Sequence, residues 1–161
     1  MEIIIIYDAD SPGTRLVAQS IGSGFTPGNR VRLADAKAID KKVLPEIDVL
    51  IVGSASHRSR PSKAIKNFLN NLPKKSLQNI AVAAFEIKIK RSFISYFSRR
   101  NPSREKRYAS NQIDKMLIRK GGIQVLDPEL FFFRNSLRPL NMNELLRAKN
   151  WGREIESLCP G

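Results

Sequence analysis

Three residues near the start of the chain have the types and spacing of a phosphate-binding turn. Ser11, Gly13 and Thr14 follow the apolar run at residues 3–7 and lead into a helical pattern. Hydroxyl groups and unpaired backbone N–H groups at a helix N-terminus can hold a phosphate without any catalytic side chain. The same residues can also serve only to begin the helix, because Ser11 is a good N-cap and Pro12 suits the first helical turn.

Two acidic residues within this stretch, Asp8 and Asp10, oppose the binding of a phosphate. At about 8 Å and an effective dielectric constant of about 20, each carboxylate–phosphate pair costs on the order of 2 kcal/mol. Arg15 in the first helical turn can offset one of these charges. We therefore expect a phosphate-containing ligand to bind weakly here.

A second polar stretch follows the apolar run at residues 48–53 and offers hydroxyls, a flat ring and a cation. Its residues are Ser54, Ala55, Ser56, His57 and Arg58. His57 is the only histidine, so it cannot build a histidine-rich metal site, and no other residues have the spacing of metal ligands. The stretch can line a ligand, or His57 can be a surface residue without a role.

Residues 87–108 concentrate the positive charge of a chain whose formal net charge is +13. This basic segment contains one glutamate, Glu105, and eight cationic residues: Lys88, Lys90, Arg91, Arg99, Arg100, Arg104, Lys106 and Arg107. Phe93, Tyr96 and Phe97 are interleaved with the cations. Together they suit an anionic partner, whether nucleic acid, a lipid surface or an acidic protein. In the alternative, the apolar residues only pack the segment onto the domain while its charges stay solvated.

The elements that must position these residues alternate between strands and helices. Apolar runs predict strands at residues 3–7, 48–53 and 80–85, and a weaker one at 31–33. Residues 122–126 and 131–133 predict a fifth strand, which Asp127 and Pro128 interrupt. Apolar stripes predict helices at residues 14–21, 61–72 and 143–158. Five such βα units predict an α/β fold, a doubly wound parallel sheet with helices on both faces.

In a sheet of this kind, ligands bind beyond the carboxyl ends of the strands. Residues 8–14, 54–60 and 86–110 are therefore expected to meet at one edge. The length of 161 residues fits a single domain, residues 1–161. Cys159 is the only cysteine, the first residues lack the pattern of a signal peptide, and no apolar run approaches the ~20 residues that span a bilayer. We expect a soluble cytoplasmic protein.

Taken in order, these motifs resemble the flavodoxin family over nearly the whole chain. The first strand and its loop to Gly13 and Thr14 resemble the family's first strand and phosphate loop. Residues 48–54, followed by residues 60–63, resemble its third strand, flavin loop and next helix. Pro139-Leu140, Glu144-Leu145 and the stretch from Ala148 to Trp151 are similar to the family's closing segment. The resemblance implies a five-stranded parallel sheet in the order 2-1-3-4-5.

The resemblance also implies flavin mononucleotide (FMN) as cofactor and electron transfer as activity. The flavin contacts that it implies are Asp10, Ser11, Gly13, Thr14, residues 54–58 and, after the fourth strand, Phe85, Glu86 and Ile87. The sequence departs from the family pattern at Ala9, Pro12, Ala55 and His57. Because Ala9 lacks a hydroxyl and Pro12 lacks a backbone donor, these departures favour weak or lost flavin binding.

Two functions are consistent with these patterns. In the first, the chain binds FMN, exchanges electrons with an acidic redox partner and uses no catalytic side chain of its own. In the second, it is a flavodoxin-like binding module with a degraded flavin site. Such a module would dock on a nucleic acid, an acidic protein or a membrane surface through its basic segment.

Overall fold

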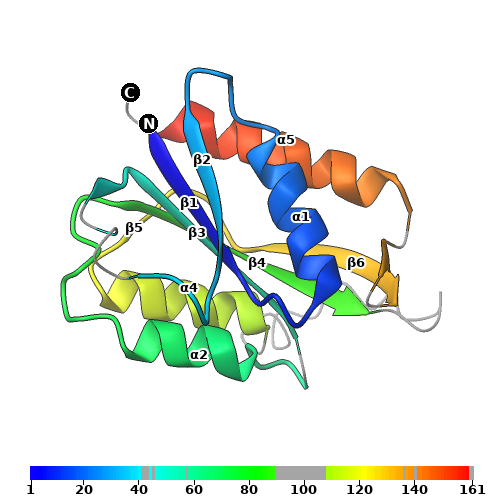
Figure 1. Cartoon of the computed structure of the whole chain (residues 1–161), viewed down its shortest axis with the longest axis horizontal. Coiled ribbons are helices and arrows are strands. Elements are labelled where there is room, and N and C mark those ends of the chain that lie inside the picture. Colours follow the sequence, from blue (N-terminus) through cyan, green and yellow to red (C-terminus); the bar gives the residue numbers. More distant parts are fainter. Residues whose placement is uncertain are drawn as a thin grey trace.

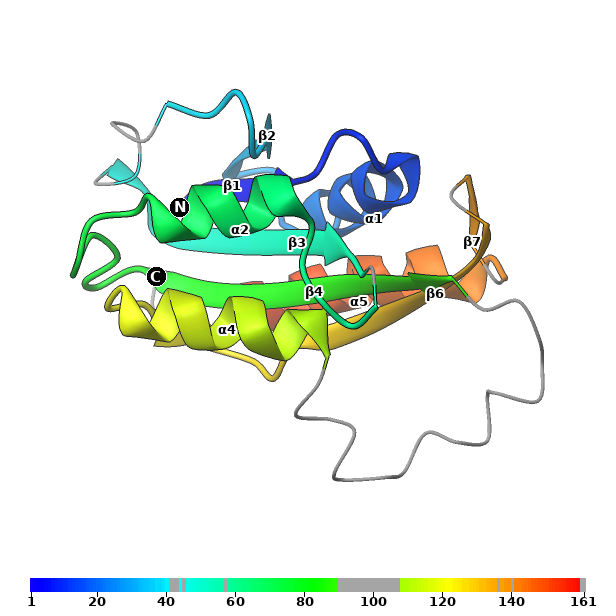
Figure 2. The same cartoon turned by 90° about the horizontal axis from the view of Figure 1, so that it is seen from below.

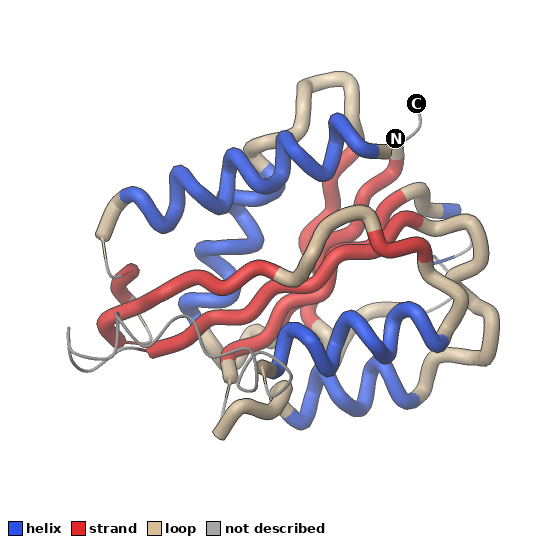
Figure 3. The backbone as a smooth tube through the Cα atoms, turned by 180° about the vertical axis from the view of Figure 1, so that it is seen from behind, coloured by secondary structure: helices blue, strands red, loops and turns tan. Residues whose placement is uncertain are grey.

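The computed structural model describes residues 1–40, 44, 46–56, 58–89, 108–135, 137–139 and 141–159. Along the chain the elements are β1 (Glu2–Tyr7), α1 (Pro12–Gly22), β2 (Arg30–Asp35), β3 (Val49–Ala55), α2 (Lys63–Asn70), β4 (Ala81–Ile89), α4 (Ala109–Arg119), β5 (Ile123–Gln124), β6 (Glu129–Asn135), β7 (Arg138–Pro139) and α5 (Asn143–Leu158). The sheet lies between two layers, with α1 and α5 on one face and α2 and α4 on the other (Figures 1 and 3). No helix of the described residues is long and apolar enough to cross a membrane.

The sheet confirms the predicted α/β class and differs from the prediction at one edge. Within the described residues its order is β2-β1-β3-β4-β6-β7, and β5 also pairs with β4. The strands β2, β1, β3 and β4 are parallel and take the predicted order. The predicted fifth strand forms two strands, β5 and β6, and β7 follows them. The predicted order of five strands, 2-1-3-4-5, was therefore wrong at its last strand.

The break in that strand has a local cause. The short β5 is parallel to β4 at Ala81 and Val82, and β6 is parallel to β4 from Phe85 onwards. Pro128 lies between the two strands and cannot donate a ladder hydrogen bond. After β6 the chain turns back, and β7 pairs with β6 in the antiparallel sense.

Among the helices, α2 begins later than predicted and α4 is an addition to the prediction. The α2 helix begins at Lys63 rather than at residue 61, because Ser62 is its N-cap and accepts a hydrogen bond from the Ile65 N–H. The α4 helix was not predicted, and it begins immediately after Tyr108, where the basic segment ends. Both helices cover the same face of the sheet (Figure 2).

Aromatic side chains fill the core beneath α1 and α5. Phe85 of β4 makes edge-to-face contacts with Phe131 and Trp151, at ring-centroid distances of 6.2 and 6.5 Å. The ring of Phe85 lies over Gly53 of β3, where a Cβ atom would come within 1.9 Å of it. Gly53 is therefore needed for this close approach, and Phe85 is a core residue.

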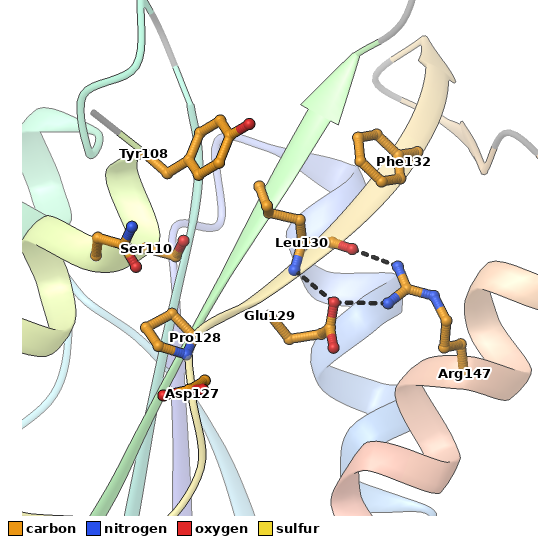
Figure 4. Close-up of a pocket in the computed structure, with 9 residues that line it drawn as sticks. Tyr108, Ser110, Asp127, Pro128, Glu129, Leu130, Phe132 and Arg147 are labelled. Carbon is orange, nitrogen blue, oxygen red and sulfur yellow. Dashed lines mark hydrogen bonds and ion pairs between the residues drawn. The ribbon is translucent and has the colours of Figure 1, made fainter. Parts of the chain in front are cut away.

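Side chains cover the outer edge of β6 where no described strand pairs with it (Figure 4). The Phe132 N–H donates to Glu144 Oε2 at 2.7 Å, and the Leu130 N–H donates to Glu129 Oε1 at 2.9 Å. Arg147 donates to the Leu130 carbonyl and to both glutamates. Glu144 and Arg147 belong to α5, so this helix satisfies backbone groups that a neighbouring strand would otherwise bind.

Candidate functional site

The predicted phosphate loop satisfies most of its own donors. The Ser11 N–H donates to the Asp8 carbonyl at 3.1 Å, and the Asp10 N–H donates to Asp8 Oδ1 at 3.0 Å. The Thr14 N–H donates to the Ser11 carbonyl at 3.0 Å. Thr14 is fully buried, and its hydroxyl lies 2.7 Å from the Asp8 carbonyl and 2.6 Å from that of Ser11. These groups hold the loop together.

Three donors at the start of α1 remain for a ligand. The Ser11 hydroxyl makes no capping hydrogen bond, and the Gly13 N–H has no partner in the described part of the chain. Arg15 is exposed one turn further along. Pro12 occupies the first helical position and has no N–H to offer. The residues present fit a phosphate with a reduced set of donors.

Asp10 is held away from the core of the loop by an ion pair. Its carboxylate pairs with Lys37 Nζ, which comes from the segment after β2. The hydrogen bond that Lys37 donates to Asp10, with the nearby charges of Asp8 and Asp35, raises the pKa of Lys37 above its usual range. Lys37 therefore neutralises part of the negative charge that Asp10 brings to the predicted phosphate site.

The second polar stretch is tied to the start of α2. Ser54 is fully buried, and its hydroxyl accepts the Ser62 N–H at 2.8 Å and lies 2.9 Å from the Ala55 carbonyl. The Ser56 N–H donates to the Ile87 carbonyl at 3.1 Å, which joins the segment after β3 to β4 itself. The structure thus brings two of the three predicted flavin segments into direct contact.

The rest of this stretch turns sharply towards α4. Arg58 and Ser59 have φ values of 50° and 61°, in the left-handed region. The Ser59 carbonyl accepts a hydrogen bond of 2.7 Å from Gln112 Nε2 of α4. Arg58 is exposed, whereas the predicted His57 lies outside the described residues.

The three predicted residues of β4 are buried. Phe85 and Ile87 belong to the core on the α1 and α5 side. Glu86 is fully buried on the other side, and its Oε2 accepts hydrogen bonds from the Ser110 N–H at 3.0 Å and the Ser110 hydroxyl at 3.3 Å. Because Tyr108 gives α4 no side-chain cap, Glu86 fills that position. Flavin contact at these positions stays a prediction.

Of the predicted cations of the basic segment, Lys88 alone is described. It lies in β4, and its Nζ is 3.9 Å from the centre of the Tyr108 ring. The other seven lie outside the described residues: Lys90, Arg91, Arg99, Arg100, Arg104, Lys106 and Arg107. Their role as a docking surface therefore stays a prediction.

A groove of about 550 Å³ lies between the start of α4 and β6 (Figure 4). Tyr108 and Ser110 line one side, and Leu130, Phe132 and Arg147 line the other. None of the predicted flavin residues lines this groove. The sequence held no signal for it, because it depends on α4, whose cap Glu86 lies 24 residues earlier in the chain.

Solved structures with a similar fold include flavodoxins. Oxidised flavodoxin 2 from Bacillus cereus superimposes with a TM-score of 0.75 at 17% identity, covering 98% of this chain and 99% of that one. Oxidised flavodoxin 1 from the same organism gives 0.74 at 15% identity, covering 98% of both chains. A flavodoxin from the domain Archaea gives 0.73 at 18% identity, covering 98% of this chain and 97% of that one. No protein-family model and no curated protein matches the sequence. The chain has a flavodoxin-like fold.

Proposed function

We propose that this chain with a flavodoxin-like fold is an electron-transfer protein that binds FMN weakly. The observation that carries the proposal is that the predicted phosphate loop follows β1 and the second polar stretch follows β3, at the edge where these neighbouring parallel strands end (Figure 2). Ligands of doubly wound sheets bind at this edge. Similarity to three flavodoxins along nearly the whole chain supports the same assignment.

Each segment would hold a different part of the cofactor. The Ser11 hydroxyl, the Gly13 N–H and Arg15 would bind the phosphate at the positive end of α1. Ser56 and Arg58 would lie beside the ring. Bound FMN would supply the group that accepts and releases electrons, so no side chain need act as acid, base or nucleophile.

The affinity for FMN is expected to be weak because donors of the predicted phosphate loop already form hydrogen bonds within the loop. A hydrogen bond to a charged group is worth about 1.5–3 kcal/mol. The loss of two such donors therefore costs about 3 kcal/mol, or roughly a hundredfold in affinity. The hydroxyl of Thr14 and the N–H of Asp10 are donors of this kind, and both are engaged within the loop.

The test is a titration of FMN and of riboflavin, followed by the quenching of flavin fluorescence. FMN should bind with a micromolar Kd, and Ser11→Ala should weaken FMN about tenfold without affecting riboflavin. Ser20→Ala, in the same helix and far from the loop, is the matched control. A nanomolar Kd for FMN would show that the loop retains its donors, and the absence of binding at millimolar FMN would refute electron transfer.

A second candidate function is a flavin-free docking module, and the carboxylate of Asp8 favours it. This carboxylate is nearly buried and accepts the Asp10 N–H, so it occupies a donor that a phosphate would use. The two candidates differ in a simple observation on the purified protein. An FMN-binding protein quenches the fluorescence of added FMN, whereas the docking module leaves that fluorescence unchanged up to millimolar FMN.

A further inference from the structure

The ends of β4, β6 and β7 form one tip of the sheet. Ile89 of β4 is the register partner of Phe133 of β6, which in turn is opposite Pro139 of β7. The turn between β6 and β7 is fixed by Asn135, whose Oδ1 accepts the backbone N–H groups of the next described residues, Leu137 and Arg138, at 2.9 and 3.0 Å. The side chains of this turn therefore project from a defined backbone.

The two most exposed large apolar side chains of the described residues belong to the stretch between β6 and α5. Met142 is 75% exposed and Leu137 is 64% exposed, while Ile89 at the end of β4 is 49% exposed. Single exposed apolar residues are common on protein surfaces, but a group of them indicates a binding surface. None of the three lines the groove between α4 and β6.

Cationic side chains flank these apolar residues. Arg134 and Arg138 are exposed, and neither forms an ion pair with a described residue. Residues 90–107, which follow Ile89 in the sequence, contain seven lysines and arginines and one glutamate. The described cations at the tip are therefore Arg134 and Arg138.

We propose that Ile89, Leu137 and Met142, with Arg134 and Arg138, form a docking surface for a membrane containing anionic phospholipids. Protruding aliphatic side chains enter the boundary between headgroups and acyl chains, and arginines bind the lipid phosphates. A nucleic acid would instead favour aromatic side chains on which bases stack, and the exposed apolar residues of the tip are aliphatic.

The proposal does not depend on flavin binding. None of the five residues belongs to the loops after β1 and β3, and none contributes to the hydrogen bonds of the predicted phosphate loop. Membrane docking and FMN binding can therefore be tested separately on the same full-length protein.

The experiment is sedimentation of the full chain with lipid vesicles. One set contains phosphatidylcholine alone, and the other also contains about one-third phosphatidylglycerol. The protein should bind only the anionic vesicles, and salt should weaken the binding. Leu137→Ser with Met142→Ser should weaken it about tenfold, and Arg134→Ser with Arg138→Ser should weaken it and reduce its dependence on salt.

The matched control is Ile118→Ser with Ile123→Ser. These side chains are 44% and 56% exposed, and Ile123 pairs with Ala81 at the opposite end of β4 from Ile89. The control should bind vesicles like the wild type, and circular dichroism should show that every variant is folded. Equal binding by the Leu137/Met142 variant and the control would overturn the proposal, as would binding of single-stranded DNA in preference to anionic vesicles. FMN titration of the Leu137/Met142 variant should be unchanged, which separates this proposal from the proposed function.

Discussion

Two regions at the carboxyl edge of the sheet use polar residues in opposite ways. On the side of β1, β3 and β4, four polar side chains are buried and hydrogen-bonded within the fold: Asp8, Thr14, Ser54 and Glu86. At the tip of β6 and β7, Arg134 and Arg138 are exposed and make no ion pair with any described residue. The buried side chains contribute to the stability of the fold, whereas the exposed arginines of the tip remain free to bind a partner.

This contrast predicts two separate classes of variant. Changes to the buried groups should lower the free energy of unfolding, because each removes a hydrogen bond or leaves its partner without one. Changes to the tip should leave stability nearly constant and alter only the binding of a partner. Experiments at Glu86, Thr14 and the tip test this division. Asp114 is an exception among the buried groups, because its Oδ1 has no hydrogen-bond partner among the described residues and its replacement is expected to stabilise the protein.

The largest effect is expected from Asp114, a buried carboxylate of α4 whose Oδ1 has no hydrogen-bond partner in the described part of the chain. Burial, with the nearby charge of Asp127, raises its pKa to about 6. The folded state therefore binds this proton more tightly than the unfolded state. The stabilisation is complete below the ordinary pKa of about 4 and is lost as the pH rises through about 6, a change of up to about 3 kcal/mol.

Asp114→Asn should abolish this dependence and make the protein more stable than the wild type at neutral pH. Urea unfolding of both proteins between about pH 4 and pH 8 measures it. Lys115, whose charge lowers the pKa of Asp114, provides a control. Lys115→Gln should raise that pKa further, and parallel pH profiles for the wild type and Asp114→Asn would refute the assignment.

Removal of the Glu86 carboxylate should have the next largest effect. Glu86→Ala should cost about 2 kcal/mol, because it leaves the N–H and the hydroxyl of Ser110 without their buried acceptor. Glu86→Gln keeps an acceptor oxygen and should cost less. Denaturant unfolding of both variants tests the cap, and equal losses would mean that Glu86 does not serve as the cap of α4.

A smaller loss is expected when the hydroxyl of Thr14 is removed. Thr14→Val retains the shape of the side chain but leaves the carbonyls of Asp8 and Ser11 without this donor, at a cost of about 1 kcal/mol. Thr14→Ser retains the hydroxyl and is the control. Thermal unfolding measures the difference between them, and a fully stable Thr14→Val protein would show that the hydroxyl is available to a ligand.

The smallest change in stability is expected at the tip. Arg134→Ser together with Arg138→Ser should alter the free energy of unfolding by less than about 0.5 kcal/mol, because exposed cations without ion pairs contribute little to folding. Urea unfolding provides the measurement. A loss above about 1 kcal/mol would mean that these arginines support the β6–β7 turn and are not reserved for a partner.

Much of the fold could be predicted because buried parallel strands are continuous apolar runs in the sequence, as in β1 and β3. Both halves of the last predicted strand are strands, β5 and β6, but their separation and the following β7 could not be predicted. The short β7 has no apolar pattern, and it forms because Asn135 fixes the turn before it. The cap of α4 was hidden for another reason, since Glu86 and Ser110 become neighbours only when β4 and α4 pack together.

The sequence predicted which residues belong to the candidate site, but not which hydrogen bonds their side chains form. A sequence shows that Thr14 and Ser54 carry hydroxyls, whereas only coordinates show that the loop itself uses both. The exposed residues of the tip could not be predicted from the sequence either. Leu137 and Met142 are of the same types as core residues, and their exposure depends on the turn and the helix start that carry them.

The side chains that cover the outer edge of β6 also bear on how the molecule behaves in a crowded solution. An uncovered strand edge can recruit a strand from another chain, and aggregation through such edges is a common hazard for sheet proteins. The N–H groups of Leu130 and Phe132 are both taken by glutamates, so a foreign strand would have to displace Glu129 and Glu144 before it could pair here. Damage to this cover would therefore first appear as a loss of solubility, in a molecule whose individual fold is still intact.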